Sequence, residues 1–135
     1  MWEHFAHQAD IGIRATAASL SSAFEDAAVA LMAIVTEPKN VQPLECVKIE
    51  CDAEDEELLF VNWLNSIIYE MAVGKMLFSK FEVKIENLTV FAKIWGEKID
   101  QAKHSPAVEP KAATYNQLSV KEENGKWTVQ CVIDV

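Results

Sequence analysis

Two aspartates and a terminal carboxylate are the groups in this sequence best suited to binding a ligand. Asp10 precedes a segment in which apolar residues alternate with small or polar ones, and Asp134 stands next to the last residue, Val135. Carboxylate oxygens are the ligands that hard divalent cations prefer. Both aspartates lie among apolar neighbours, where a carboxylate needs a hydrogen-bond partner, water or a cation. We expect a divalent-cation site if the fold brings the two ends together, although Asp10 could instead cap a turn.

Of the three histidines, His7 and His104 are secondary candidates for this site and His4 is not. His4 and His7 are three residues apart, so on a strand their side chains point to opposite faces and do not share a metal ion unless the segment bends. Partly buried structural roles are the commoner outcome for such histidines. His7, near Asp10, and His104, in a later loop, are kept as secondary candidates. The sequence has no Gly-rich phosphate loop, nucleophile elbow or zinc-protease motif, and it predicts no catalytic centre.

Residues 96–111 form a long polar stretch without a helix or strand pattern. They contain the densest basic cluster of an acidic chain, which consists of Lys98, Lys103, His104 and Lys111. Long loops in compact domains are often functional, and loops on a rigid scaffold carry many binding sites. The alternative is a solvated crossover between two hairpins. The sequence favours neither interpretation.

The negative charge is unevenly distributed along the chain. The formal net charge is −9, and six of the eight residues at positions 50–57 are acidic. Acidic residues are favoured at a helix start by the helix dipole, and we prefer this interpretation to a docking patch for a basic partner. Nucleic-acid affinity comes largely from clustered Lys and Arg, so we expect no strong direct binding to nucleic acid.

Composition predicts one cytoplasmic domain spanning residues 1–135. This length is ordinary for a single domain, and half of the residues are hydrophobic. The three cysteines are odd in number and form no C-x-x-C pair, which favours free thiols in a reducing compartment over disulfides or a zinc site. No apolar run reaches the roughly 20 residues that span a bilayer, and the amino end does not resemble a signal peptide, so we expect neither membrane insertion nor export.

The elements that must position these residues can be read from apolar periodicity. Apolar spacings of three and four predict a helix capped by Ser19 and ending near residue 34, and a more apolar, central helix over about residues 53–72. Period-2 alternation and turn signals predict strands at residues 11–16, 47–51, 81–86, 88–95, 118–121 and 127–133. Asn124-Gly125 is the strongest hairpin signal. Two main helices with antiparallel hairpins indicate an α+β fold.

The chain also resembles a known family. The matching motifs follow the family order over almost the whole chain: His7, Ala9 to Ile13; Leu20, Ala23 to Glu25; Leu58, Leu59, Trp63 to Asn65; Gly96, Glu97, Asp100; Lys111, Ala112, Thr114, Tyr115; and Asp134, Val135. Each motif alone is weak, but six in register are specific. Together they resemble the archease family.

This resemblance implies an α+β fold with a strand-helix-strand-strand unit, and an accessory role rather than independent catalysis. Archeases assist RtcB-type RNA ligases, which join RNA ends at a 2′,3′-cyclic phosphate or 3′-phosphate in tRNA splicing and RNA repair. They promote guanylylation of the ligase's active-site histidine and its multiple turnover. Some are linked to tRNA methyltransferases in a chaperone-like role.

The family's functional residues can be carried over to this chain. Asp10 and Asp134 match metal-binding aspartates, and the carboxylate of Val135 would be a third ligand. Lys111 matches a lysine that is important for activating the ligase. The implied cofactor is a divalent ion, calcium first, with magnesium or manganese as alternatives.

Three residues depart from the family pattern. Gln8 replaces a threonine beside Asp10, and Asn116 replaces a histidine after Thr114 and Tyr115. Pro110 replaces an apolar residue before Lys111 and biases the preceding residue toward an extended conformation. None of the three is a proposed ligand, and the last two bear on how Lys111 is held.

Two other functions compete with ligase activation. The first is an adaptor or chaperone for RNA-modifying enzymes, with the acidic run at residues 50–57 as its contact surface. The second is a metal-dependent hydrolase that uses Asp10 and Asp134 with His7 or His104. We rank the ligase activator first, the adaptor second and the hydrolase third.

Overall fold

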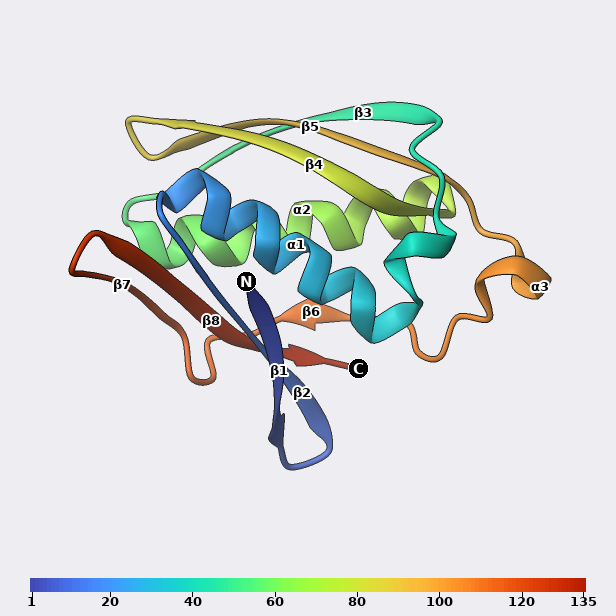
Figure 1. Cartoon of the computed structure of the whole chain (residues 1–135), viewed down its shortest axis with the longest axis horizontal. Helices are drawn as coiled ribbons and strands as arrows, with labels where there is room; N and C mark the ends of the chain where they lie inside the picture. The colour runs from blue at the N-terminus through green and yellow to red at the C-terminus, as the bar shows by residue number, and fades with distance from the viewer.

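An antiparallel sheet of five strands forms one outer layer of the molecule (Figure 1). The structure, a computed structural model, describes all 135 residues. The strands follow the order β1 (Trp2–His7), β2 (Asp10–Ala17), β8 (Lys126–Asp134) and β6 (Ala112–Ala113), and β7 (Ser119–Glu123) also pairs with β8. Ile13 and Ala15 on β2 pair with Cys131 and Val129 on β8, and all four are buried on the inner face.

A second antiparallel sheet forms the opposite layer. Its strands lie in the order β3 (Glu45–Asp52), β5 (Thr89–Lys98) and β4 (Met76–Glu86). Asn87 and Leu88 both have positive φ and make the two-residue turn between β4 and β5. A Cβ at Gly96 would lie 1.8 Å from the carbonyl oxygen of Leu77, so the close approach of β5 to the irregular start of β4 requires glycine.

Two long helices lie side by side between the sheets (Figure 1). Helix α1 (Leu20–Val35) begins where the Ser19 hydroxyl accepts the Ser22 N–H, at 3.1 Å. Helix α2 (Glu56–Gly74) begins where the Asp55 carboxylate accepts the Leu58 N–H, at 2.8 Å. Two short helices, η1 (Pro38–Asn40) and α3 (Gln101–His104), lie in connections. None of the helices combines the length and the hydropathy needed to cross a membrane.

One hydrophobic core joins all of these layers. It contains 32 buried residues drawn from both helices and both sheets. Trp63 on α2 is fully buried, and its indole N–H donates to the Phe24 carbonyl on α1 at 3.0 Å, which satisfies the polar end of its ring. A core shared in this way holds the two sheets at fixed positions, including the strand ends that carry the aspartates.

The predicted α+β fold is confirmed, with differences at element boundaries. The first strand is part of a hairpin, because residues 2–7 form β1 and pair with β2 around a turn at Gln8 and Ala9. Helix α2 starts three residues later than expected because Asp55 caps it. The acidic run is consequently divided: Glu50 and Asp52 belong to β3, and Glu56 and Glu57 to the first turn of α2.

Candidate functional site

The structure brings the two ends of the chain together. Strands β2 and β8 are antiparallel neighbours, and Ile11 pairs with Ile133. The next positions in this register are Asp10 and Asp134, so the two aspartates stand opposite each other at the same end of the strand pair. The Val135 N–H also faces the Asp10 carboxylate, with 3.4 Å between the nitrogen and Oδ1.

His7, Asp10 and Asp134 form one row across three strands. His7 pairs with Asp10 in the β1–β2 hairpin, and residues paired directly across an antiparallel ladder share a face. The core side is occupied by Ile133, so this row lies on the outer face of the sheet. All three residues are half-buried, and the Nδ1 atom of His7 is buried without a hydrogen-bond partner. The row therefore contains oxygen and nitrogen atoms that can bind a cation and that the protein leaves largely without hydrogen bonds.

The other histidine of the first strand is occupied elsewhere. His4 lies on the opposite face of β1, where its Nε2 is 2.8 Å from the Ala30 carbonyl oxygen of α1. The expectation that His4 and His7 point to opposite faces is confirmed. His4 is thus a structural residue that ties β1 to α1.

Lys111 stands beside Asp134. Its backbone N–H donates to the Asp134 carbonyl oxygen at 2.8 Å, immediately before β6 pairs with β8. The next residues are held as well: the Ala113 N–H donates to Oδ1 of Asn65 on α2 at 2.7 Å, and the Thr114 N–H donates to the Val132 carbonyl at 3.0 Å. The Lys111 side chain is exposed, and its ammonium group makes no hydrogen bond or ion pair within the chain. A fixed backbone therefore carries an exposed, unpaired lysine at the strand end that holds Asp134.

The donor set suits a hard cation only if the terminal carboxylate takes part. No group of three or more His, Cys, Asp and Glu side chains lies close enough together to hold a metal ion. Asp10, Asp134 and the Val135 carboxylate would supply oxygen ligands, which Ca²⁺, Mg²⁺ and Mn²⁺ prefer. The Asp134 carboxylate accepts no hydrogen bond from the protein, so its oxygens are available. The chemistry of these groups fits the divalent ion that the resemblance implies.

The rest of the predicted basic loop is used for internal contacts. The Lys98 ammonium donates to the Gly74 carbonyl at the end of α2, at 2.8 Å. Lys103 forms an ion pair of 2.7 Å with Glu97. The ammonium of Lys103, together with the Gln42 N–H and the His104 ring, lowers the pKa of Glu97 from 4.5 to about 2. Of the four basic residues, Lys111 alone is left free for an external partner.

His104 does not contribute to the chain-end site, which consists of Asp10, Asp134 and the carboxylate of Val135. Its side chain is fully buried, and Nδ1 accepts the Asp100 N–H at 2.9 Å. An acceptor nitrogen carries no proton, so the ring proton is on Nε2, which lies 3.0 Å from Oε2 of Glu97. Helix α3, which carries His104, lies at one extremity of the molecule, away from the C-terminus (Figure 1). The structure assigns His104 to anchoring the connection between β5 and β6.

Two positions at the site could not be recognised from the sequence. Gln8 makes the β1–β2 turn with a φ of 55°, although the turn has neither Gly nor Asn. In the sequence Asn65 stands out only as part of a family motif, yet its side chain holds the strand that follows Lys111. The one available signal was its amide group beside a very apolar stretch of α2, where a buried polar group needs a partner.

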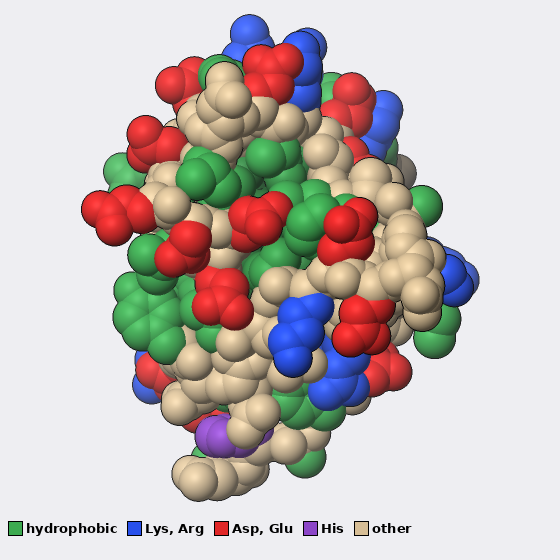
Figure 2. Space-filling model, turned by 90° about the vertical axis from the view of Figure 1, so that its left-hand side faces the viewer, with side chains coloured by type: hydrophobic (Ala, Val, Ile, Leu, Met, Phe, Trp, Pro, Cys, Tyr) green, Lys and Arg blue, Asp and Glu red, His purple; other side chains and the backbone are tan.

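Acidic side chains predominate at the end of the molecule where β3 leads into α2 (Figure 2). The residues there are Asp52, Glu54, Asp55, Glu56 and Glu57. Apart from the capping bond to Asp55, none of these carboxylates takes part in an ion pair or side-chain hydrogen bond. This surface is a second feature that a protein partner could recognise.

Comparison with known proteins adds the family context. The chain matches the archease protein family over residues 2–135. It is 39% identical to the protein archease of Sulfurisphaera tokodaii and 38% identical to that of Pyrococcus abyssi, covering 99% of this chain and 98% of each relative.

Solved structures show the same fold. The solution structure of a Methanobacterium thermoautotrophicum protein superposes with a TM-score of 0.88 at 29% identity, covering 99% of this chain and 98% of that one. A Thermotoga maritima archease, described as a possible chaperone, superposes with a TM-score of 0.65 at 18% identity, covering 98% and 96%. The second likeness concerns the fold alone.

Proposed function

This chain belongs to the archease family, and we propose that it is an accessory protein that activates an RtcB-type RNA ligase in tRNA splicing or RNA repair. In this role it promotes guanylylation of the ligase histidine and multiple turnover without catalysing a reaction itself. The observation that carries the proposal is the backbone hydrogen bond from Lys111 to Asp134, which joins the free lysine to the paired aspartates.

The proposed mechanism places the chain-end site in the nucleotide pocket of the ligase. A divalent ion held by Asp10, Asp134 and the Val135 carboxylate would supply positive charge close to nucleotide phosphates. The exposed ammonium of Lys111 would bind a phosphate oxygen and help to orient it for attack by the ligase histidine. Positioning and charge compensation are the main contributions to phosphate transfer of this kind.

The fold supports this role because it holds Lys111 before the partner arrives. The strand that follows Lys111 is bonded to β8 and to Asn65 on α2, so only the lysine side chain must be ordered on binding. Groups held in this way lose less conformational entropy when they bind. The β1–β2 turn, which directly precedes Asp10, extends beyond the rest of the sheet (Figure 1), so this end of the molecule can enter a pocket.

The test is RNA joining by an RtcB-type ligase with excess substrate, GTP and a divalent ion. We expect product to exceed one equivalent per ligase only when this protein is present. Lys111→Ala and Asp134→Ala should remove the effect, and Lys121→Ala, which changes an exposed lysine on the β7–β8 hairpin, should retain it. A ligase from the same cell that is indifferent to the folded protein would overturn the proposal. Incubation of the protein alone with RNA and metal tests the metal-dependent hydrolase.

The second candidate function is an adaptor or chaperone for a tRNA-modifying enzyme such as a tRNA methyltransferase. The acidic surface at the start of α2 favours it. In that case Glu54→Lys with Glu57→Lys should abolish binding to the modifying enzyme, whereas Lys111→Ala should not. Ligase activation predicts the reverse pattern in the joining assay.

The cysteines support a place in the reducing cytoplasm. All three are free thiols, and none has a partner for a disulfide. Burial raises the pKa of Cys131 to about 12, and it also raises the pKa of Cys51, so both thiols stay protonated. Cys131 is buried, Cys51 is half-buried and Cys46 is exposed, and an exposed unpaired thiol persists in a reducing compartment.

A further inference from the structure

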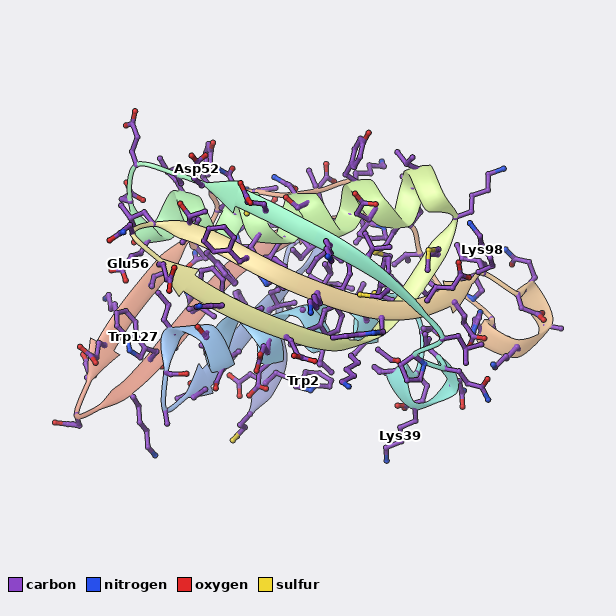
Figure 3. All side chains as sticks on the ribbon, turned by 90° about the horizontal axis from the view of Figure 1, so that it is seen from above. Trp2, Lys39, Asp52, Glu56, Lys98 and Trp127 are labelled. Carbon is purple, nitrogen blue, oxygen red and sulfur yellow. The ribbon has the colours of Figure 1, made fainter.

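The two edges of the three-stranded sheet differ in how they are protected. At the β4 edge, the Val83 N–H donates to the Glu25 carboxylate of α1 at 2.8 Å, so a helix side chain covers a backbone group of that edge. At the other edge, β3 pairs only with β5, and the one backbone group that a helix side chain covers is the carbonyl of its last residue, Asp52. Figure 3 shows β3 on the side of the sheet from which α2 extends beyond the strands. An edge strand of this length can accept another strand.

The hydrogen bond between β3 and α2 shows which backbone groups face outward. The Asn62 side chain donates to the Asp52 carbonyl at 2.9 Å, so the backbone groups of Asp52 point away from β5. Successive residues of a strand direct their N–H and C=O groups to alternate sides. Lys48 and Glu50 therefore also direct their backbone N–H and C=O groups away from β5, where no other strand meets them.

There is room for an added strand beside these groups. A groove of about 560 Å³ runs between β3 and α2. Its floor is the polar stripe of α2, which consists of Asn62, Ser66, Tyr69 and Glu70. A strand added to β3 would lie roughly 4.8 Å away from it. Its side chains would alternate between this floor and the solvent face of the sheet.

The charges of the groove define the occupant. Glu50, Asp52 and Glu70 line it against a single cation, Lys48. We propose that β3 is a docking edge for a basic, extended segment of a partner protein, which adds to the sheet as a fourth strand. A second copy of this chain would bring the same net negative charge, three carboxylates against one ammonium group, into the groove, which disfavours self-association. Recognition by strand addition takes its affinity from the backbone bonds and its specificity from the alternating side chains.

The proposal can be tested with a defined peptide and the full chain. The probe is an eight-residue peptide in which arginine and valine alternate, and binding is followed by backbone amide shifts and by titration calorimetry. We expect the largest shifts at Lys48 and Glu50. Lys48→Pro removes an outward N–H and leaves the β5 ladder intact, so it should weaken binding at least tenfold. Glu70→Lys should weaken it by a similar factor, and this change lies on the helix, outside the strand.

The controls separate strand addition from simple charge attraction. Glu122→Lys makes the same charge change on the exposed β7–β8 hairpin and should leave the affinity within twofold. A peptide with its alternate backbone amides N-methylated on the pairing side should lose binding. Equal binding of this peptide, equal binding by Lys48→Pro, shifts that map to another surface, or no binding at all would each overturn the proposal. A concentration-dependent dimer with shifts at β3 would also overturn it in favour of self-association.

Discussion

The backbone N–H of Lys111 lies 2.8 Å from the carbonyl oxygen of Asp134, and this bond joins the free lysine to the end of β8. The other end of the chain meets the same point, because Asp10 lies opposite Asp134 in the extended β2–β8 register. Three groups from distant parts of the sequence thus meet at one place on the sheet. Changes to any one of them should therefore act on a single activity.

Binding of a divalent cation at the chain ends should stabilise the fold. A ligand that binds only the folded state adds about 2.7 kcal/mol at a concentration one hundred times its Kd. We expect calcium chloride to raise the melting temperature of the wild-type protein relative to a chelator. Asp10→Asn and Asp134→Asn should each remove most of that rise.

The matched control for cation binding is Glu122→Gln, which removes one carboxylate from the exposed β7–β8 hairpin. This variant should keep the full calcium-dependent rise. If both aspartate variants respond to calcium as the wild type does, the cation does not bind at the chain ends.

Asn65 should hold the strand that carries Lys111. Its Oδ1 accepts the Ala113 N–H at 2.7 Å, so Asn65→Ala leaves a partly buried donor unsatisfied. The loss should cost about 1–3 kcal/mol of unfolding free energy, measured by urea denaturation. Hydrogen exchange at Ala113 should become faster, and stimulation of the ligase should fall. Asn65→Asp keeps an acceptor oxygen and should preserve slow exchange; equally slow exchange in Asn65→Ala would show that the bond is unimportant.

Most of the fold could be predicted from the sequence because the signals were local. Ser19 caps α1, and Asn124 with Gly125 turns β7 into β8 through two residues of positive φ. The β1–β2 hairpin was missed because its turn contains Gln8, whose side chain gives no sign of a left-handed conformation. The start of α2 was misplaced because several acidic residues in a row could each have served as the cap.

The candidate site could be predicted less completely because it depends on contacts between distant segments. Carboxylate chemistry singled out Asp10 and Asp134, but only the β2–β8 register places them opposite each other. The basic residues of the loop are close together in the sequence. In the structure, Lys103 and His104 contact Glu97 near the start of the loop, whereas Lys111 is at its end. Tertiary packing decides which lysine remains free. The charge pattern of the sequence did not single out Lys111, and only the family resemblance pointed to it.

Gly12 should be required by the ring of Phe5 on the neighbouring strand. The two residues are paired, and a Cβ at Gly12 would lie 2.2 Å from the Phe5 ring. Gly12→Ala must displace this ring, which also carries the Arg14 guanidinium 4.7 Å from its centroid. We expect a loss of about 1–3 kcal/mol in unfolding free energy.

A double-mutant cycle tests the cause of the Gly12→Ala cost. In a Phe5→Ala background the added methyl group has space, so Gly12→Ala should cost much less there. Additive losses of unfolding free energy in the double variant would show that the ring is not the obstacle.

Glu97 should make the protein sensitive to acid within a defined range. The Lys103 ammonium, the Gln42 N–H and the His104 ring hold the pKa of Glu97 at about 2, below its ordinary value of 4.5. Because the folded state binds this proton less readily than the unfolded chain, the carboxylate stabilises the fold above about pH 4.5, and the contribution is lost as the pH falls toward 2. Urea denaturation between these pH values should show a steeper loss of stability for the wild type than for Glu97→Gln.

The control Glu122→Gln should follow the wild type, since that carboxylate has no partner. Parallel pH profiles for the wild type and Glu97→Gln would mean that Glu97 is equally acidic in the unfolded chain, and its contacts would then contribute nothing that depends on pH.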